Sequence, residues 1–179
     1  QYTVADNYLE HVYKNLRESR EKVMVFLTEK GIEESELSFS TPFLVDKKAQ
    51  QYGGAQIVDF RYIVNQTITV YSEKVPETRE IMGNLDELGK SGVALTGDQY
   101  QLRTQYLFNR LNEIKPEMIE QSTIEARKVA QKFAEDSDSK LGKIKTAYQG
   151  QFSISDRDAN NPHIKKVRVV STVVYYLSD

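Results

Sequence analysis

The chain has no cysteine and no tryptophan among its 179 residues. The absence of cysteine excludes disulfides, thiolate catalysis, zinc–thiolate sites and iron–sulfur clusters. It leaves the compartment open, because a cysteine-free chain survives in oxidising and reducing surroundings alike. We therefore expect a fold held together by ordinary packing and a function that needs no thiol.

Long apolar runs are also absent. No stretch of about 18 apolar residues occurs, so we expect no membrane span in this chain. No charged-then-apolar leader opens it either. Because the chain begins at Gln1 rather than Met, we expect a processed or truncated form that lacks either a cleaved leader or an N-terminal membrane anchor.

Neither sign of charge is in large excess. The net charge is -2 and the pI is about 5.8, whereas proteins that bind nucleic acid usually carry a clustered basic excess. Basic residues do flank the last two expected strands, but alternation places most of them opposite apolar residues, as on an ordinary solvated face. We predict no nucleic-acid partner. The basic residues concerned are Lys140, Lys143, Lys145, Lys165, Lys166 and Arg168.

Regular hydrophobic spacing is what the sequence does contain, in a chain long enough for one core. We predict a single domain over residues 1–179. Three- and four-residue spacing predicts helices over 3–30, 75–90 and 116–138, and alternation predicts strands over 36–45, 60–70, 99–107, 143–154 and 165–177. This order, α-β-β-α-β-α-β-β, predicts an α+β fold in which a mainly antiparallel sheet packs against helices.

A strip of small side chains marks the third expected helix. Ala126, Ala130 and Ala134 recur every four residues, so they share one face of a helix. We interpret this strip as close packing of the helix onto the sheet, with a seam between copies of the chain as the alternative. In the packing interpretation the flanks are filled by Ile119, Val129 and Phe133.

The last expected strand, "KKVRVVSTVVYYL", is apolar on both faces beyond Val169. If one face is buried by the helices of the same chain, Val170, Val174 and Tyr176 project from the other face. Such a patch usually marks an interface, so we predict a homo-oligomer that pairs face to face, most simply with twofold symmetry. The alternative is that further opening strands of the intact protein cover this face.

Signals of catalysis are scarce. His11 and His163 are the only histidines, and neither lies in a metal-binding spacing such as HExxH. The nucleophile elbow, the dinucleotide turn and the phosphate loop are absent as sequence motifs. We predict no catalytic residue, no cofactor and no metal. The alternative is a hydrolase or metal enzyme that uses an unrecognised set of carboxylates.

Several short pieces, taken in order, resemble the SIMPL-domain family and within it the bacterial YggE-like branch. The resemblance is strongest over residues 106–154 and the final strand, and it extends upstream through "VMVFLTEKGIEESELSFS" and "ITVYSEKVPETREI". The most specific pieces are Leu111-Asn112, Lys115-Pro116-Glu117-Met118, Ala126-Arg127, Phe133-Ala134, Leu141-Gly142 and Gln149-Gly150.

The resemblance implies a non-enzymatic protein of the periplasm or cell envelope that assembles with itself and serves in a stress-related response. It implies no known chemistry or ligand. A cytoplasmic signalling adaptor, the role suggested for distant animal relatives, is the alternative. The family usually opens with strands before its first helix, and we expect these to be missing here. A glycine common in the family is replaced by Asp138, which makes the end of the third helix harder to place.

Overall fold

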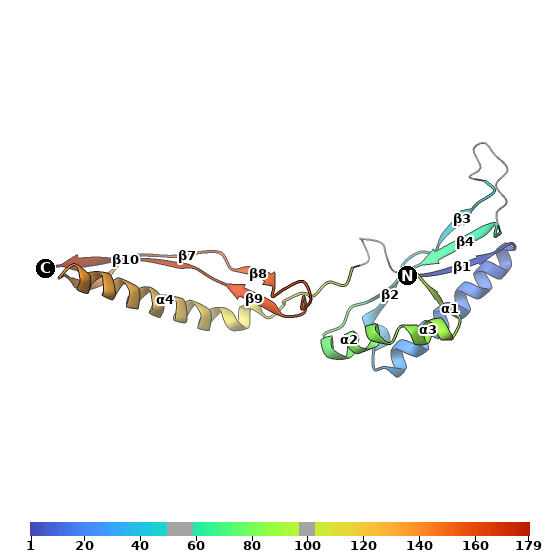
Figure 1. Cartoon of the computed structure of the whole chain (residues 1–179), viewed down its shortest axis with the longest axis horizontal. Coiled ribbons are helices and arrows are strands. Elements are labelled where there is room, and N and C mark those ends of the chain that lie inside the picture. Colours follow the sequence, from blue (N-terminus) through green and yellow to red (C-terminus); the bar gives the residue numbers. More distant parts are fainter. Residues whose placement is uncertain (50–58, 97–102) are drawn as a thin grey trace. The chain divides into compact units, whose positions relative to one another are not determined.

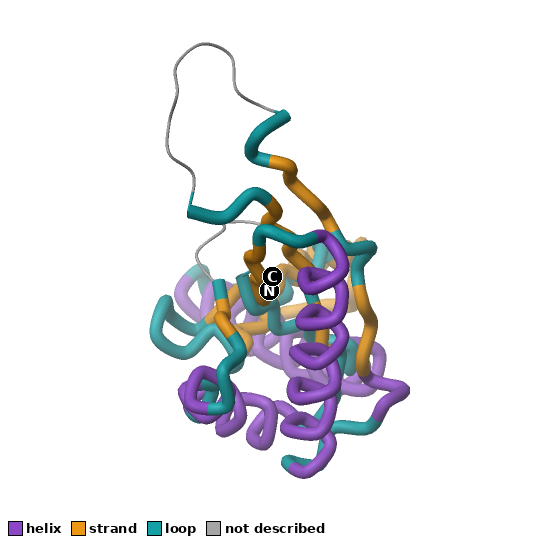
Figure 2. The backbone as a smooth tube through the Cα atoms, turned by 90° about the vertical axis from the view of Figure 1, so that its right-hand side faces the viewer, coloured by secondary structure: helices purple, strands orange, loops and turns teal. Residues whose placement is uncertain are grey.

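The structure is a computed structural model that describes residues 1–49, 59–96 and 103–179. The chain divides into two compact units, residues 1–103 and 104–179. Both combine helices with antiparallel strands, so the predicted α+β fold class is confirmed (Figures 1 and 2). The prediction of one domain over residues 1–179 stays a prediction.

The first unit is built on a four-stranded antiparallel sheet with the strand order β3-β4-β1-β6. Val4 and Leu44 both lie opposite Val64, which is fully buried. Side chains that point in the same direction as Val64 therefore form the core side of this sheet. The strands are β1 (Tyr2–Asp6), β3 (Phe43–Asp46), β4 (Tyr62–Gln66) and β6 (Ala94–Leu95).

Helix α1 (Leu9–Glu29) packs against β1 and β4. Its buried side chains recur at helical spacing and meet the apolar side of the sheet, as an amphipathic helix requires. They close a core that also includes Tyr2 and Val64. The buried residues of the helix are Val12, Leu16, Val23, Phe26 and Leu27.

The predicted helix over residues 3–30 was wrong at its start, because Tyr2–Asp6 forms β1. Tyr2 is buried on the core side of the sheet and Thr3 bonds across the ladder to Asn65, so the segment pairs rather than coils. Asp6 lies just before the start of α1, and its carboxylate accepts a hydrogen bond from the backbone N–H of Tyr8 at 2.9 Å. A strand therefore precedes the first helix, contrary to the expected lack of opening strands.

Shorter elements complete the first unit. Strand β2 (Leu37–Phe39) pairs with β5 (Ile68–Val70), and a 3₁₀ turn at Glu34–Glu36 precedes β2. The helix predicted over 75–90 is two helices, α2 (Val75–Gly83) and α3 (Asp86–Lys90). The break falls at Asn84, whose side-chain amide donates to the Glu80 carbonyl at 3.1 Å and so competes with continuation of the helix.

The second unit consists of one long helix and one long hairpin whose strands are interrupted, so that β8–β9 forms its tip and β7–β10 its base (Figure 1). Helix α4 packs along both strands of the antiparallel pair β7–β10, and the pair β8–β9 extends it. The helix ends at Asp136, and Asp138, with a φ of 53°, turns the chain into β7. The elements are α4 (Leu111–Asp136), β7 (Lys140–Gln149), β8 (Ser153–Asp156), β9 (Lys165–Arg168) and β10 (Ser171–Ser178).

Three predictions for residues 99–177 need correction. Helix α4 begins at Leu111, not at Pro116, which lies inside the helix. Of the strand predicted over 99–107, residues 99–102 lie outside the described residues, and residues 103–107 form no strand. The strands predicted over 143–154 and 165–177 are each divided in two.

The two units differ in what they bury. The hydrophobic side chains buried in the described chain lie in the first unit, except for Ala134 of α4. No helix among the described residues is both long enough and apolar enough to cross a bilayer.

Candidate interaction surface

Residues from Ile164 to Tyr176 alternate without a break between exposed and partly buried. The alternation continues through Val169 and Val170, which lie between β9 and β10. Since successive side chains of an extended chain point to opposite sides, the segment presents two distinct faces. We call the exposed set the outward face: Ile164, Lys166, Arg168, Val170, Thr172, Val174 and Tyr176.

The opposite, inward side of this segment meets α4. The Ser171 and Ser122 hydroxyls lie 2.6 Å apart and form a hydrogen bond between β10 and the helix. Val173 and Tyr175, further along β10, are partly buried. Because α4 covers only the inward side of the segment, the outward face is the side that stays exposed.

The alanine strip lies among the less exposed positions of α4. Ala134 is buried, and Ala126 and Ala130 are partly buried, whereas Phe133 is 68% exposed. Val129 is also exposed, so the expectation that Val129 and Phe133 fill the flanks was wrong. The reason is that a two-stranded hairpin is too narrow to reach both sides of the helix.

The predicted self-association residues all lie on the outward face. Val170 is 47% exposed, Val174 43% and Tyr176 56%. Tyr148 of β7 lies opposite Thr172 in the ladder and is also exposed, which widens the apolar surface. At one end, the Lys145 ammonium lies 5.7 Å from the centre of the Tyr176 ring, within range of a cation–π interaction.

Two glycines, at Gly142 and Gly150, allow the two backbones of the hairpin to approach each other closely. A Cβ added at Gly150 would lie 2.7 Å from the Val170 carbonyl oxygen, and one at Gly142 would lie 2.9 Å from the Tyr176 carbonyl oxygen. Side chains larger than hydrogen are excluded at both positions unless the strands move apart. The sequence pieces Leu141-Gly142 and Gln149-Gly150 therefore mark close strand contacts at two outward-face residues.

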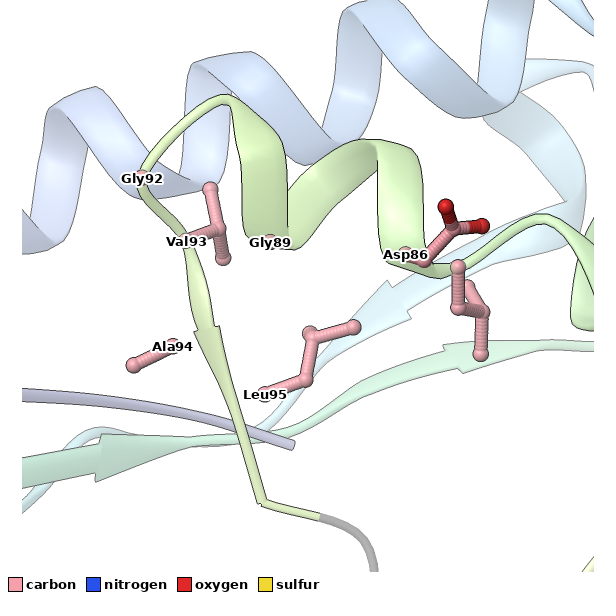
Figure 3. A pocket seen from close by; sticks show the side chains of 7 residues that line it. Asp86, Gly89, Gly92, Val93, Ala94 and Leu95 are labelled. Carbon is pink, nitrogen blue, oxygen red and sulfur yellow. The ribbon is translucent and has the colours of Figure 1, made fainter.

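A shallow groove in the first unit is the other candidate site. It has a volume of about 730 Å³ and lies between α3 and β6, where Leu95 extends toward the helix (Figure 3). Its one titratable side chain is Asp86, whose pKa is lowered by a hydrogen bond from Lys90. The groove is open and largely apolar, and it contains no pair of groups suited to acid–base chemistry. Its lining residues are Leu85, Asp86, Gly89, Gly92, Val93, Ala94 and Leu95.

The two histidines lie in different units. The His11 imidazole, on α1, is 3.6 Å from the Asp6 carboxylate and mostly exposed. The His163 ring contacts the ring of Tyr106 at 5.9 Å between centroids. Within residues 1–49, 59–96 and 103–179, no three or more histidine or acidic side chains are grouped as metal ligands would be. The prediction that the protein is not an enzyme stays a prediction.

Comparison with known proteins adds one finding. The model of the family described as SIMPL, a protein of unknown function (DUF541), matches residues 2–175 and so extends over both units. None of the curated proteins matches the chain.

Proposed function

Because the chain belongs to the SIMPL family, whose function is unknown, we propose a role from its surface: a non-enzymatic module of the bacterial cell envelope that assembles with copies of itself. The observation that carries this proposal is the outward face. Val170, Val174 and Tyr176 expose apolar surface along one side of a hairpin, over about 20 Å of strand. Apolar patches of this kind on soluble proteins usually mark an interface.

The small core of the second unit supports the same proposal. In this unit a 26-residue helix lies on a hairpin, and Ala134 is the one buried hydrophobic residue among those described. Burial of apolar surface is the main favourable term in folding. A second copy that covers the outward face would add to the apolar burial that this unit lacks on its own.

The experiment compares the wild type with Val174→Asp by light scattering after size exclusion. We expect the wild type to form a dimer or larger species and Val174→Asp to be monomeric, because a carboxylate buried in an apolar contact is strongly unfavourable. Val25→Asp is the matched control, since Val25 is a similarly exposed valine on α1. A wild type that stays monomeric at high concentration would contradict the proposal, provided that circular dichroism shows all three proteins folded.

Location in the envelope and a stress-related role rest on the resemblance to the YggE-like branch. Fractionation of cells that produce the full-length protein tests the location. We expect the protein in the periplasmic or membrane fraction, whereas recovery from the cytosol would favour the alternative, a signalling adaptor.

The absence of enzymatic activity is tested with His11→Ala/His163→Ala, and a metal-dependent turnover lost in this variant would favour an enzyme.

A further inference from the structure

The outward face carries positive charge as well as apolar surface. Lys166 and Arg168 project from β9 on the same side as Val170 and Val174. Asp156 is the one acidic residue of strands β7–β10, and it lies opposite Lys165 in the ladder, where it forms an ion pair with that residue. Lys165 belongs to the inward set, so the strands offer no carboxylate to the outward cations.

This charge distribution is unfavourable for a twofold contact of the outward face with itself. Each copy would bring Lys166 and Arg168 to a surface of the same sign, with no acidic strand residue to compensate them. Cations that lose water without gaining a partner are costly, and like charges at an interface disfavour the pairing. A complementary surface should therefore be acidic.

Such a surface exists on α4. Glu113, Glu117 and Glu120 recur at four- and three-residue spacing and are all exposed, and we call them the glutamate strip. Arg110 pairs with Glu113, whereas no ion pair of the described residues includes Glu117 or Glu120. Glu117 and Glu120 are like charges at three-residue spacing, which slightly destabilises a helix unless a cation meets them.

We propose that the outward face of one copy docks on the glutamate strip of the next copy. The inference rests on the proposed self-assembly and specifies its geometry. Lys166 and Arg168 are about 7 Å apart along an extended strand, and successive glutamates of the strip are separated by about 4.5–6 Å along the helix. Ile124 lies one turn beyond Glu120 and is 46% exposed, so it offers an apolar contact for the valines that follow Arg168.

A contact between two different surfaces is head-to-tail. Each copy then uses its outward face toward one neighbour and its glutamate strip toward another. Such an assembly closes into a ring when the rotation per copy allows it and otherwise grows as a filament. It differs from the twofold pair expected from the sequence, in which a single surface is used twice.

The first experiment reverses each half of the contact in the full chain. Lys166→Glu/Arg168→Glu and Glu117→Lys/Glu120→Lys should each weaken assembly roughly 10-fold or more in dissociation constant, measured by analytical ultracentrifugation. The four substitutions together restore opposite charges across the contact, and they should recover wild-type assembly. Lys14→Glu/Arg17→Glu on α1 is the matched control and should assemble like the wild type.

The second experiment mixes two defective chains. Val174→Asp keeps an intact glutamate strip, and Glu117→Lys/Glu120→Lys keeps an intact outward face. A head-to-tail contact predicts that the mixture forms a complex of two chains that neither variant forms alone. A contact that uses one surface twice predicts no such complex.

The outcomes separate the two proposals. A monomeric wild type removes the self-assembly itself. A wild type that assembles, is dissociated by Val174→Asp and is unaffected by Glu117→Lys/Glu120→Lys keeps self-assembly and overturns the glutamate strip as its partner surface. The wild type is also tested on phosphatidylglycerol vesicles. Binding that is lost only in Lys166→Glu/Arg168→Glu would assign the cations to an anionic lipid surface and would overturn the glutamate strip as their partner. Circular dichroism of every variant is the control that tests whether the variant is folded.

Discussion

The first unit and the second unit use the same kinds of element with opposite results. In the first, α1 and the sheet enclose a core that includes Val12, Val64 and Ile32, all nearly inaccessible. In the second, a longer helix lies on strands and buries little beyond Ala134. An α+β arrangement therefore does not by itself supply a closed core, and the width of the sheet under the helix is decisive.

The physical reason is one of dimensions. Neighbouring strands are about 4.8 Å apart, so four strands span about 14 Å, which is wider than a helix of about 10 Å. Two strands are narrower than the helix. The side chains of α1 can spread onto the sheet in both directions, whereas Val129 and Phe133 of α4 extend past the hairpin and stay exposed.

Truncation of one phenylalanine in each unit tests the difference in burial most strongly. Phe26 of α1 is 8% exposed and Phe133 of α4 is 68% exposed. We expect Phe26→Ala to lower the free energy of unfolding by about 3–5 kcal/mol, because it removes apolar contacts and leaves a cavity. Phe133→Ala should change it by less than about 0.5 kcal/mol. Urea unfolding followed by circular dichroism measures both, and equal effects would contradict the contrast between the units.

A smaller effect is expected from an added methyl group in the hairpin. Gly150→Ala places a Cβ against the Val170 carbonyl oxygen, and the strand shift needed to relieve it should cost about 1–3 kcal/mol. Gly89→Ala in α3 is the control, since its Cβ would meet no atom within 4 Å and helix propensity favours alanine by up to about 1 kcal/mol. Hydrogen exchange of the β7–β10 amides localises the loss. Unchanged protection of these amides in Gly150→Ala would argue against the close contact.

The smallest effect concerns pH and the ion pair at the end of β3. Hydrogen bonds from Arg61 hold the pKa of Asp46 below its usual value. A carboxyl with a lowered pKa stabilises the folded state above its unfolded pKa of about 3.9, and this contribution is lost as the pH falls through the folded pKa. We expect Arg61→Met to be less stable than the wild type at pH 7, with a difference that shrinks toward pH 2. A difference in melting temperature that is independent of pH would contradict this expectation.

The features predicted best from the sequence are those that depend on a simple period. Alternation alone placed Val170, Val174 and Tyr176 on one side of the last strand, and four-residue spacing placed the alanine strip on one face of α4. The fold class followed from the same patterns. These features depend on local geometry, which any chain of that sequence shares.

Other features depend on partners that lie far away in the sequence. Tyr2–Asp6 is a strand because β4 and β6 are there to pair with it, about 60 and 90 residues away. Residues 103–107 belong to a segment whose alternation predicts a strand, yet they form no strand. The glutamate strip had a signal in the spacing of Glu113, Glu117 and Glu120, but its meaning depends on the cations of β9.

The unbroken alternation from Ile164 to Tyr176 has a consequence for how this segment tolerates changes in length. Val169 and Val170 join two strands and belong to neither, and joints of this kind usually accept insertions. Here one added or deleted residue would turn every later side chain to the opposite side, so that Val173 and Tyr175 would face solvent and Val174 and Tyr176 would face α4. The number of residues between β9 and β10 therefore fixes which side chains of β10 face outward. The polar segment from Arg157 to His163 can change in length without altering which face β10 presents.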